Sequence, residues 1–196
     1  MEEVLKTHTE LEVKYRVSQS DLFPFKKIIE DEFNVERFEY VTGPDYYFVK
    51  PGTQDFIRYR CAKYQTHEGE LTMKRKRHSS NNINRTEVNI KLKDPSLQDI
   101  TKMADLLGFS LNFTVLKDCY IFELSDCFMS FYSVSEVGSK KAPLFFIEIE
   151  IKEDIVDLLS AKESLELLKF YENKLSKLNI SARKRVKKSL FEIFRK

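Results

Sequence analysis

The sequence has no tryptophan and few of the residues that interrupt, cross-link or build common active sites. Its 196 residues include 5 glycines, 5 prolines, 3 cysteines and 3 histidines. So little glycine and proline excludes collagen-like and low-complexity chains. The cysteines (Cys61, Cys119 and Cys127) are odd in number and form no Cys-x-x-Cys motif, which favours reduced thiols over a disulfide framework or a zinc knuckle. The histidines are far apart, so a histidine metal site or a Ser-His-Asp triad has little to build on.

The sequence also lacks an excess of one charge and any long apolar run. Lys+Arg 33 against Asp+Glu 31 leaves a net charge of +2, which does not require a nucleic-acid or membrane partner. No apolar run approaches the roughly 20 residues that cross a bilayer, and no basic segment followed by an apolar one opens the chain. We expect a cytoplasmic protein with no membrane contact and no obligate protein partner. Its length and 42% hydrophobic content predict one domain over residues 1–196.

Short segments with strand-like alternation dominate the chain. Glycine and proline at residues 42–44, 51–52 and 68–69 predict turns between them. Helical spacing and capping signals predict four helices, at residues 19–33, 95–107, 153–177 with a break near Ser160, and 183–195. The mixture indicates an α+β fold with strands at its centre.

Five segments alternate ionic with apolar residues: 8–17, 55–60, 70–76, 84–92 and 145–151. One such strand is explained by a sheet with one face in water. Here the signs are also sorted, because acids pair on the first and last segments and bases pair on the middle ones, and solvent gives no reason for that. We therefore predict that the sheet closes, with helices on its apolar outside. The ionic faces then form a tunnel that is acidic on one side and basic on the other.

The predicted tunnel face carries five acids and, with one lysine from a later strand, seven bases. Confined like charges are costly unless counter-charges arrive. A divalent cation suits carboxylates, and a chain of phosphates suits arginine and lysine, so a metal-bound oligophosphate satisfies both groups. The acids are Glu10, Glu12, Glu87, Glu148 and Glu150, and the bases are Lys14, Arg58, Arg60, Lys74, Lys76, Arg85 and Lys117.

The motif Glu10-Leu11-Glu12-Val13-Lys14 resembles the Glu-x-Glu-x-Lys signature of the CYTH superfamily, the triphosphate tunnel metalloenzymes. This superfamily includes class IV adenylyl cyclases, thiamine triphosphatases, inorganic triphosphatases and RNA triphosphatases. The resemblance covers about residues 8–151, and the segment from Lys188 to Phe194 looks like the closing helix of the family. Further matches follow in the family's order: Asp45-Tyr46-Tyr47-Phe48, Arg58-x-Arg60, Thr72-x-Lys74, Arg85-x-Glu87, and Glu148-x-Glu150 after Gly138.

The resemblance implies a closed eight-stranded antiparallel β-barrel with helices packed outside, whose lumen holds a triphosphate and Mg²⁺ or Mn²⁺. It implies that Glu10, Glu12, Glu148 and Glu150 are metal ligands, that Glu87 holds a second metal or positions water, and that Glu10, Glu12, Glu87 and Lys14 are catalytic. The phosphate contacts that it implies are Lys14, Arg58, Arg60, Lys74, Lys76, Arg85 and Lys117.

Three positions depart from the family pattern. Tyr132 aligns with an inward-facing aspartate, Cys119 stands in place of an arginine, and Asn89 stands where a third acid often follows Arg-x-Glu. Because fewer carboxylates remain, a second metal site should be weak.

The function implied by the resemblance is hydrolysis of inorganic triphosphate, a nucleoside triphosphate, thiamine triphosphate or an RNA 5′ end. One alternative is cyclisation of ATP to cyclic AMP and pyrophosphate. Another is a module that binds a nucleotide or triphosphate without turnover. The basic runs at 74–78 and 183–188 can attract RNA, but a lumen-facing strand and a solvated helix explain them as well.

Overall fold

The computed structural model describes residues 8–61, 68–75, 84–178 and 185–195, and for residues 8–10, 68, 74–75 and 84–87 it describes the backbone alone. The helices are α1 (Leu22–Glu32), α2 (Leu97–Leu106), α3 (Glu153–Leu158), α4 (Ala161–Lys174) and α5 (Leu190–Phe194), with 3₁₀ turns at Gln19–Asp21 and Leu175–Leu178. The strands are β1 (His8–Val17), β2 (Arg37–Val49), β3 (Phe56–Cys61), β4 (Glu68–Arg75), β5 (Asn84–Lys93), β6 (Ser110–Glu123), β7 (Cys127–Glu136) and β8 (Leu144–Ile151).

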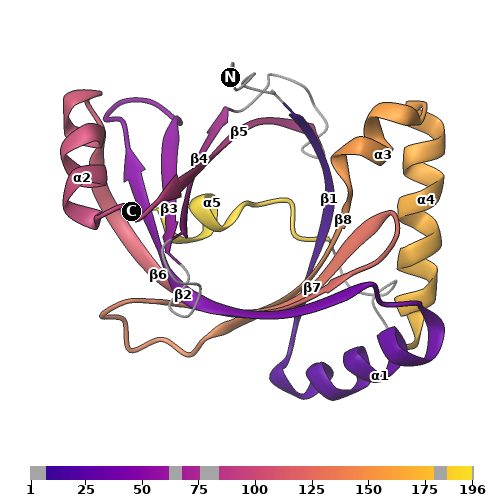
Figure 1. The fold of residues 1–196 in the computed structure, drawn as a ribbon. Helices are drawn as coiled ribbons and strands as arrows, with labels where there is room; N and C mark the ends of the chain where they lie inside the picture. The colour runs from indigo at the N-terminus through magenta and orange to yellow at the C-terminus, as the bar shows by residue number, and fades with distance from the viewer. Residues whose placement is uncertain (1–7, 62–67, 76–83, 179–184, 196) are drawn as a thin grey trace.

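The eight strands form an antiparallel sheet in the order β1-β5-β4-β3-β2-β6-β7-β8. The first strand has two partners: residues His8–Leu11 pair with β5, and residues Leu11–Val17 pair with β8. In Figure 1 the strands curve around a central space, with α5 near the middle of the view. The α+β class and the eight antiparallel strands that the sequence predicts are confirmed.

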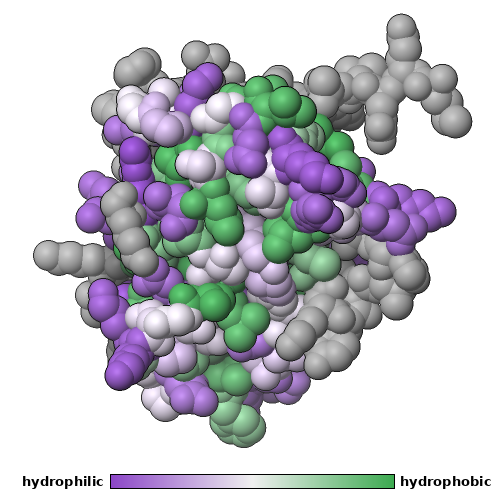
Figure 2. Space-filling view, turned by 90° about the vertical axis from the view of Figure 1, so that its left-hand side faces the viewer, coloured by the Kyte–Doolittle hydropathy of each residue, from purple (hydrophilic) through white to green (hydrophobic). Residues whose placement is uncertain are grey.

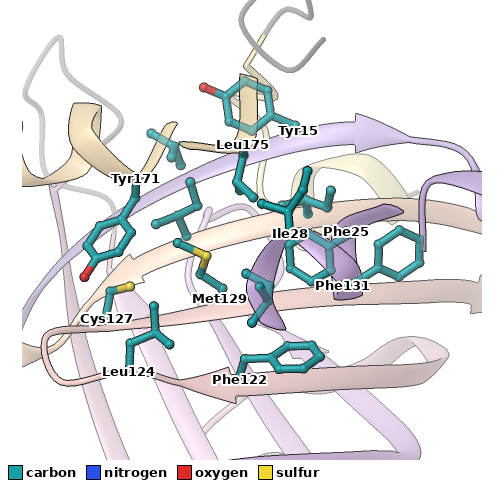
Figure 3. Close-up of a cluster of buried hydrophobic side chains, with 14 of the residues drawn as sticks. Tyr15, Phe25, Ile28, Phe122, Leu124, Cys127, Met129, Phe131, Tyr171 and Leu175 are labelled. Carbon is teal, nitrogen blue, oxygen red and sulfur yellow. The ribbon is translucent and has the colours of Figure 1, made fainter. Parts of the chain in front are cut away.

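The apolar side of the sheet is covered by helices, as predicted. Figure 1 shows α1, α3 and α4 on one side of the strands and α2 on the opposite side. Helix α1 buries Phe25, Ile28 and Ile29 at helical spacing, and α4 buries Leu168 and Tyr171. These side chains pack against the apolar residues of β1, β7 and β8, a cluster that Figure 3 shows in close-up. The ionic residues of the same strands are thereby left on the inner face.

Helix α2 covers the other part of the sheet. It packs Ile100 and Ala104 against Phe48, Ile57 and Leu71, which come from β2, β3 and β4. Figure 2 views the molecule from this side and shows apolar surface interrupted by hydrophilic side chains. In the described part of the chain, no helix is both long and apolar enough to span a membrane.

Two predicted turns are wrong. Residues 42–44 lie inside β2, and residues 68–69 begin β4. Proline is tolerated at Pro44 because β2 pairs with β3 only from Asp45 onward, so no β3 residue is opposite the proline. The turn at Pro51-Gly52 is confirmed, and Gly52 has the positive φ of 75° that such a turn favours.

The predicted break near Ser160 is also confirmed. Ser160 is the N-cap of α4, where its hydroxyl accepts from the Glu163 backbone and the Glu163 carboxylate accepts from the Ser160 backbone. At the C-terminus, the predicted helix over 183–195 is shorter than expected, because α5 covers only Leu190–Phe194 and residues 183–184 lie outside the described part. Before α5, Val186 N–H donates to the Lys14 carbonyl at 2.7 Å, which fastens this segment to β1.

Candidate functional site

A cavity of about 220 Å³ lies on the inner face of the sheet. All eight strands contribute to its wall, and the C-terminal segment adds the N-cap and first residues of α5. Its described wall carries four acids (Glu12, Glu70, Glu148, Glu150) and four bases (Lys14, Arg58, Arg60, Lys117), together with Tyr47, Phe56, Asn89, Tyr132, Ser189, Leu190 and Phe191.

The acidic side of the cavity is built by β1 and β8. Their antiparallel register places Glu12 opposite Glu150 and Lys14 opposite Glu148. The Lys14 ammonium is buried, 2.9 Å from a Glu148 carboxylate oxygen and 3.7 Å from a Glu12 oxygen. Burial alone would raise the pKa of Glu148, but Lys14 and then Lys117 outweigh it, so the pKa lies below the usual range. Glu148 is therefore a carboxylate at neutral pH.

The basic side of the cavity is built mainly by β3. Arg60 donates two hydrogen bonds, at 2.8 and 2.9 Å, to Asp45 on the neighbouring strand β2. Arg58 donates through Nη2 to Glu70 at 3.0 Å and to the Thr72 hydroxyl at 2.8 Å. Burial opposes ionisation of Glu70, but the two arginines lower its pKa. The acids thus hold both guanidinium groups in place before any ligand arrives.

Lys117 and Tyr132 lie between these two sides, on β6 and β7. The Lys117 ammonium is 4.0 Å from the centroid of the Tyr132 ring. Among the described side chains, Lys117 forms no ion pair, so its charge is available to an anion. Tyr132 is fully buried, and its hydroxyl has no hydrogen-bond partner in the described part of the chain.

Aromatic side chains close part of the cavity wall. Phe191 of α5 stacks on Phe56 with ring centroids 4.3 Å apart, and its ring lies 6.4 Å from that of Tyr47. Ser189 caps this helix by accepting from the Glu192 backbone at 3.2 Å. The C-terminal segment is thus a structural part of the cavity.

Seven of the predicted site residues line the cavity: Glu12, Lys14, Arg58, Arg60, Lys117, Glu148 and Glu150. Four others are described by backbone alone, with Glu10 paired opposite Arg85 and Lys74 opposite Glu87. Lys76 lies outside the described residues.

Sequence reasoning did not assign a site role to Glu70, Asp45 or Tyr47. The alternation of β4 was a usable signal for Glu70, because it shares a strand face with Thr72. For Asp45, the pattern of its own strand does not predict a site role. Asp45 belongs to the site because it accepts a hydrogen bond from Arg60 on β3, and a single strand's pattern does not predict that contact.

The donor set on β1 and β8 fits a divalent cation by its chemistry, because carboxylate oxygens are the ligands that Mg²⁺ and Mn²⁺ prefer. No three potential ligand side chains among those described are grouped closely enough to hold a metal ion as they stand. The Lys14 ammonium supplies the positive charge between Glu12 and Glu148. A metal there requires a further ligand, for which Glu10 is the candidate.

The fold and cavity define a class of protein in which an eight-stranded antiparallel sheet surrounds a site of mixed charge. The family model of the CYTH domain matches residues 8–185. The chain therefore belongs to the CYTH domain family, as the motif resemblance indicates. The search of curated proteins gave no match.

Solved structures agree on the fold. A conserved hypothetical protein from Pyrococcus furiosus is similar with a TM-score of 0.68 and 19% identity, covering 94% of this chain and 99% of that chain. The PH1819 protein from Pyrococcus horikoshii is similar with a TM-score of 0.68 and 20% identity, covering 94% of this chain and 97% of that chain. A proposed adenylate cyclase from Vibrio parahaemolyticus is similar with a TM-score of 0.62 and 17% identity, covering 96% of this chain and 98% of that chain.

Proposed function

We propose that this protein is a metal-dependent hydrolase of a triphosphate, bound inside a closed eight-stranded barrel within a single domain over residues 1–196. The observation that carries the proposal is the cavity wall, to which all eight strands contribute and which separates carboxylates on β1 and β8 from arginines on β3. Membership of the CYTH family supports the same class of substrate.

The bases bind the phosphate chain in this proposal. Arg58, Arg60 and Lys117 contact its oxygens and stabilise the charge that develops on the transferred phosphoryl group and the leaving group. Asp45 and Glu70 keep the two arginines in position, so little reorganisation is needed when substrate binds. Lys74, Lys76 and Arg85 are proposed as additional contacts.

The acids hold the metal and the nucleophile. Glu10, Glu12, Glu148 and Glu150 are the proposed ligands of Mg²⁺ or Mn²⁺, which when bound would neutralise phosphate charge. Lys14 is proposed to move its contact from Glu148 toward a phosphate oxygen. Glu87 is proposed to orient the water that attacks the terminal phosphorus. The bond from that phosphorus to the bridging oxygen breaks, and phosphate is released together with pyrophosphate from tripolyphosphate or ADP from ATP.

Product analysis tests the reaction. The protein is incubated with Mg²⁺ or Mn²⁺ and either tripolyphosphate or ATP, and phosphate, pyrophosphate and cyclic AMP are measured separately. From ATP we expect phosphate and ADP without pyrophosphate, and from tripolyphosphate, at least as good a substrate, we expect phosphate and pyrophosphate in equal amounts. The reason is that Cys119 replaces an arginine that would hold the α-phosphate end. Cyclic AMP as the major product would support the cyclase alternative instead. Tight binding without any product would contradict both enzyme hypotheses and support a module that binds the triphosphate without turnover.

A matched pair of variants tests the site. Glu148→Gln removes one charge from the acidic side, and we expect it to abolish turnover. The control is Glu166→Gln, which changes an exposed glutamate on α4 that contacts only Lys162 among the described ion pairs. Equal loss in both variants would contradict the assignment of the metal to the cavity.

A further inference from the structure

The hydroxyl of Tyr132 is an unusual group for the inside of a protein. The side chain is completely buried, and its hydroxyl has no hydrogen-bond partner among the described residues. A buried donor left in this way lowers the stability of the folded protein. A phenylalanine would fill the same space without that cost, so packing alone does not account for the hydroxyl.

The surroundings of the ring show what the hydroxyl is suited to meet. Tyr132 lines the cavity, and so does Arg58, whose buried Nε–H is likewise without a partner. Lys117, the base without an ion pair among the described side chains, lies over the Tyr132 ring. Two residues with unused donors therefore belong to the wall of one cavity, next to an available ammonium, and a small shift of their side chains would let them meet an acceptor-rich anion.

Tyr132 meets such an anion as a hydrogen-bond donor. Burial, together with the negative charges of Glu148 and Glu12, raises the pKa of the phenol well above its ordinary value of 10. The phenol therefore keeps its proton across the working pH range. A carboxylate at this position would instead repel phosphate and attract metal.

We propose that the Tyr132 hydroxyl binds the ligand directly, by donating a hydrogen bond to a phosphoryl oxygen of the phosphate chain. This inference rests on the proposed function, since it takes the phosphate chain as the ligand. The inference makes Tyr132 a residue that determines specificity. At this position the protein binds the anion, where an aspartate would bind a second metal ion.

The test is Tyr132→Phe, which keeps the ring under Lys117 and removes only the hydroxyl. Binding of tripolyphosphate is measured by calorimetry in the presence of Mn²⁺, binding of Mn²⁺ alone is measured separately, and the melting temperature is measured without ligand. We expect about 10-fold weaker tripolyphosphate binding, the scale of a hydrogen bond to a charged group. We also expect unchanged Mn²⁺ binding and an unchanged or higher melting temperature of the free protein.

The control is Tyr120→Phe, whose ring lies on the outer side of β6 in contact with Tyr40 and Lys26. Wild-type affinity in Tyr132→Phe would overturn the inference and leave the proposed hydrolase intact. The inference would also be overturned by a lower melting temperature of free Tyr132→Phe, because the hydroxyl would then have a structural partner. If wild-type protein binds tripolyphosphate without releasing phosphate, while Tyr132→Phe binds it more weakly, the hydrolase proposal fails and the role of Tyr132 is supported.

Discussion

Asp45 is a carboxylate with 1% of its surface exposed, held by two hydrogen bonds from Arg60. Burial would raise the pKa of this group, but the charge of Arg60 outweighs it and lowers the pKa from 3.8 to about 2. A depressed folded-state pKa stabilises the protein above the unfolded pKa, and this contribution is lost as the pH falls from 4 toward 2. The shift in pKa corresponds to about 2 kcal/mol in the free energy of unfolding at neutral pH.

We therefore predict that Asp45→Asn destabilises the protein by about 3 kcal/mol at pH 7, because it leaves Arg60 without its main partner. The variant should also lose less stability than the wild type between pH 4 and pH 2. Urea unfolding at several pH values measures both effects. Asp157→Asn, at an exposed position on α3, is the control and should behave as wild type.

At this scale the sequence predicts which residues line the cavity better than it predicts their partners. Alternation in a strand places Glu12 and Lys14 on one face without knowledge of any other strand. The pairing of Arg58 with Glu70 and Thr72 depends on the register between β3 and β4, which one strand's pattern does not contain. Whether the Tyr132 hydroxyl has a hydrogen-bond partner depends on side chains from several strands, so this feature is found only in the structure.

Among the elements, β4 has a glycine as its second residue, Gly69, where a larger side chain does not fit. A Cβ on Gly69 would lie 2.7 Å from Pro95 Cγ and 2.8 Å from Tyr59 Cε2. Tyr59 is held there by its hydrogen bond to the Pro95 carbonyl at 3.1 Å, so it cannot move aside freely. We predict that Gly69→Ala destabilises the protein by about 1–3 kcal/mol, measured by thermal unfolding. The control Gly138→Ala tests backbone strain alone, since nothing lies within 4 Å of its Cβ and its φ is 79°.

Helix α5 has only five residues, so its stability depends on packing rather than on its own hydrogen bonds. Phe191 supplies much of that packing through Phe56 and Tyr47. We predict that Phe191→Ala costs about 3–5 kcal/mol of stability, measured by urea unfolding. Phe194→Ala, at a half-buried position, should cost less. An equal loss in the two variants would mean that Phe191 does not anchor the helix.

For the whole molecule, the pattern of charge and apolar faces predicts the class, five of the eight strands and the covering helices, and the resemblance to the CYTH superfamily adds the number eight. The order of the strands in the sheet is harder to predict from the sequence pattern. One reason is that β1 pairs with β8, although more than a hundred residues separate them in the chain. By contrast, β6 and β7 are joined by a short turn in which Leu124 N–H donates to the Cys127 carbonyl at 2.9 Å. Local pairs of this kind close with little loss of chain entropy, and distant pairs close late.

This difference predicts the effects of two core substitutions on folding kinetics. Ile149→Ala lies in the β1–β8 pairing and should mainly speed unfolding, whereas Val134→Ala lies in the β6–β7 hairpin and should mainly slow folding. Stopped-flow folding in urea measures both rates. A slower folding rate for Ile149→Ala with unchanged unfolding would show that the distant pairing forms first.

The same pairing has a consequence during synthesis. The residues Leu11, Val13 and Tyr15 are made more than a hundred residues before their strand partners on β8. Until then the edge of β1 from Leu11 to Val17 has no strand partner, and unpaired strand edges in an incomplete chain favour aggregation. The same pairing brings Glu148 to Lys14, which also contacts Glu12. A nascent chain halted before Leu144 would therefore be exposed to aggregation, and it would lack Glu148 and Glu150, two of the proposed metal ligands.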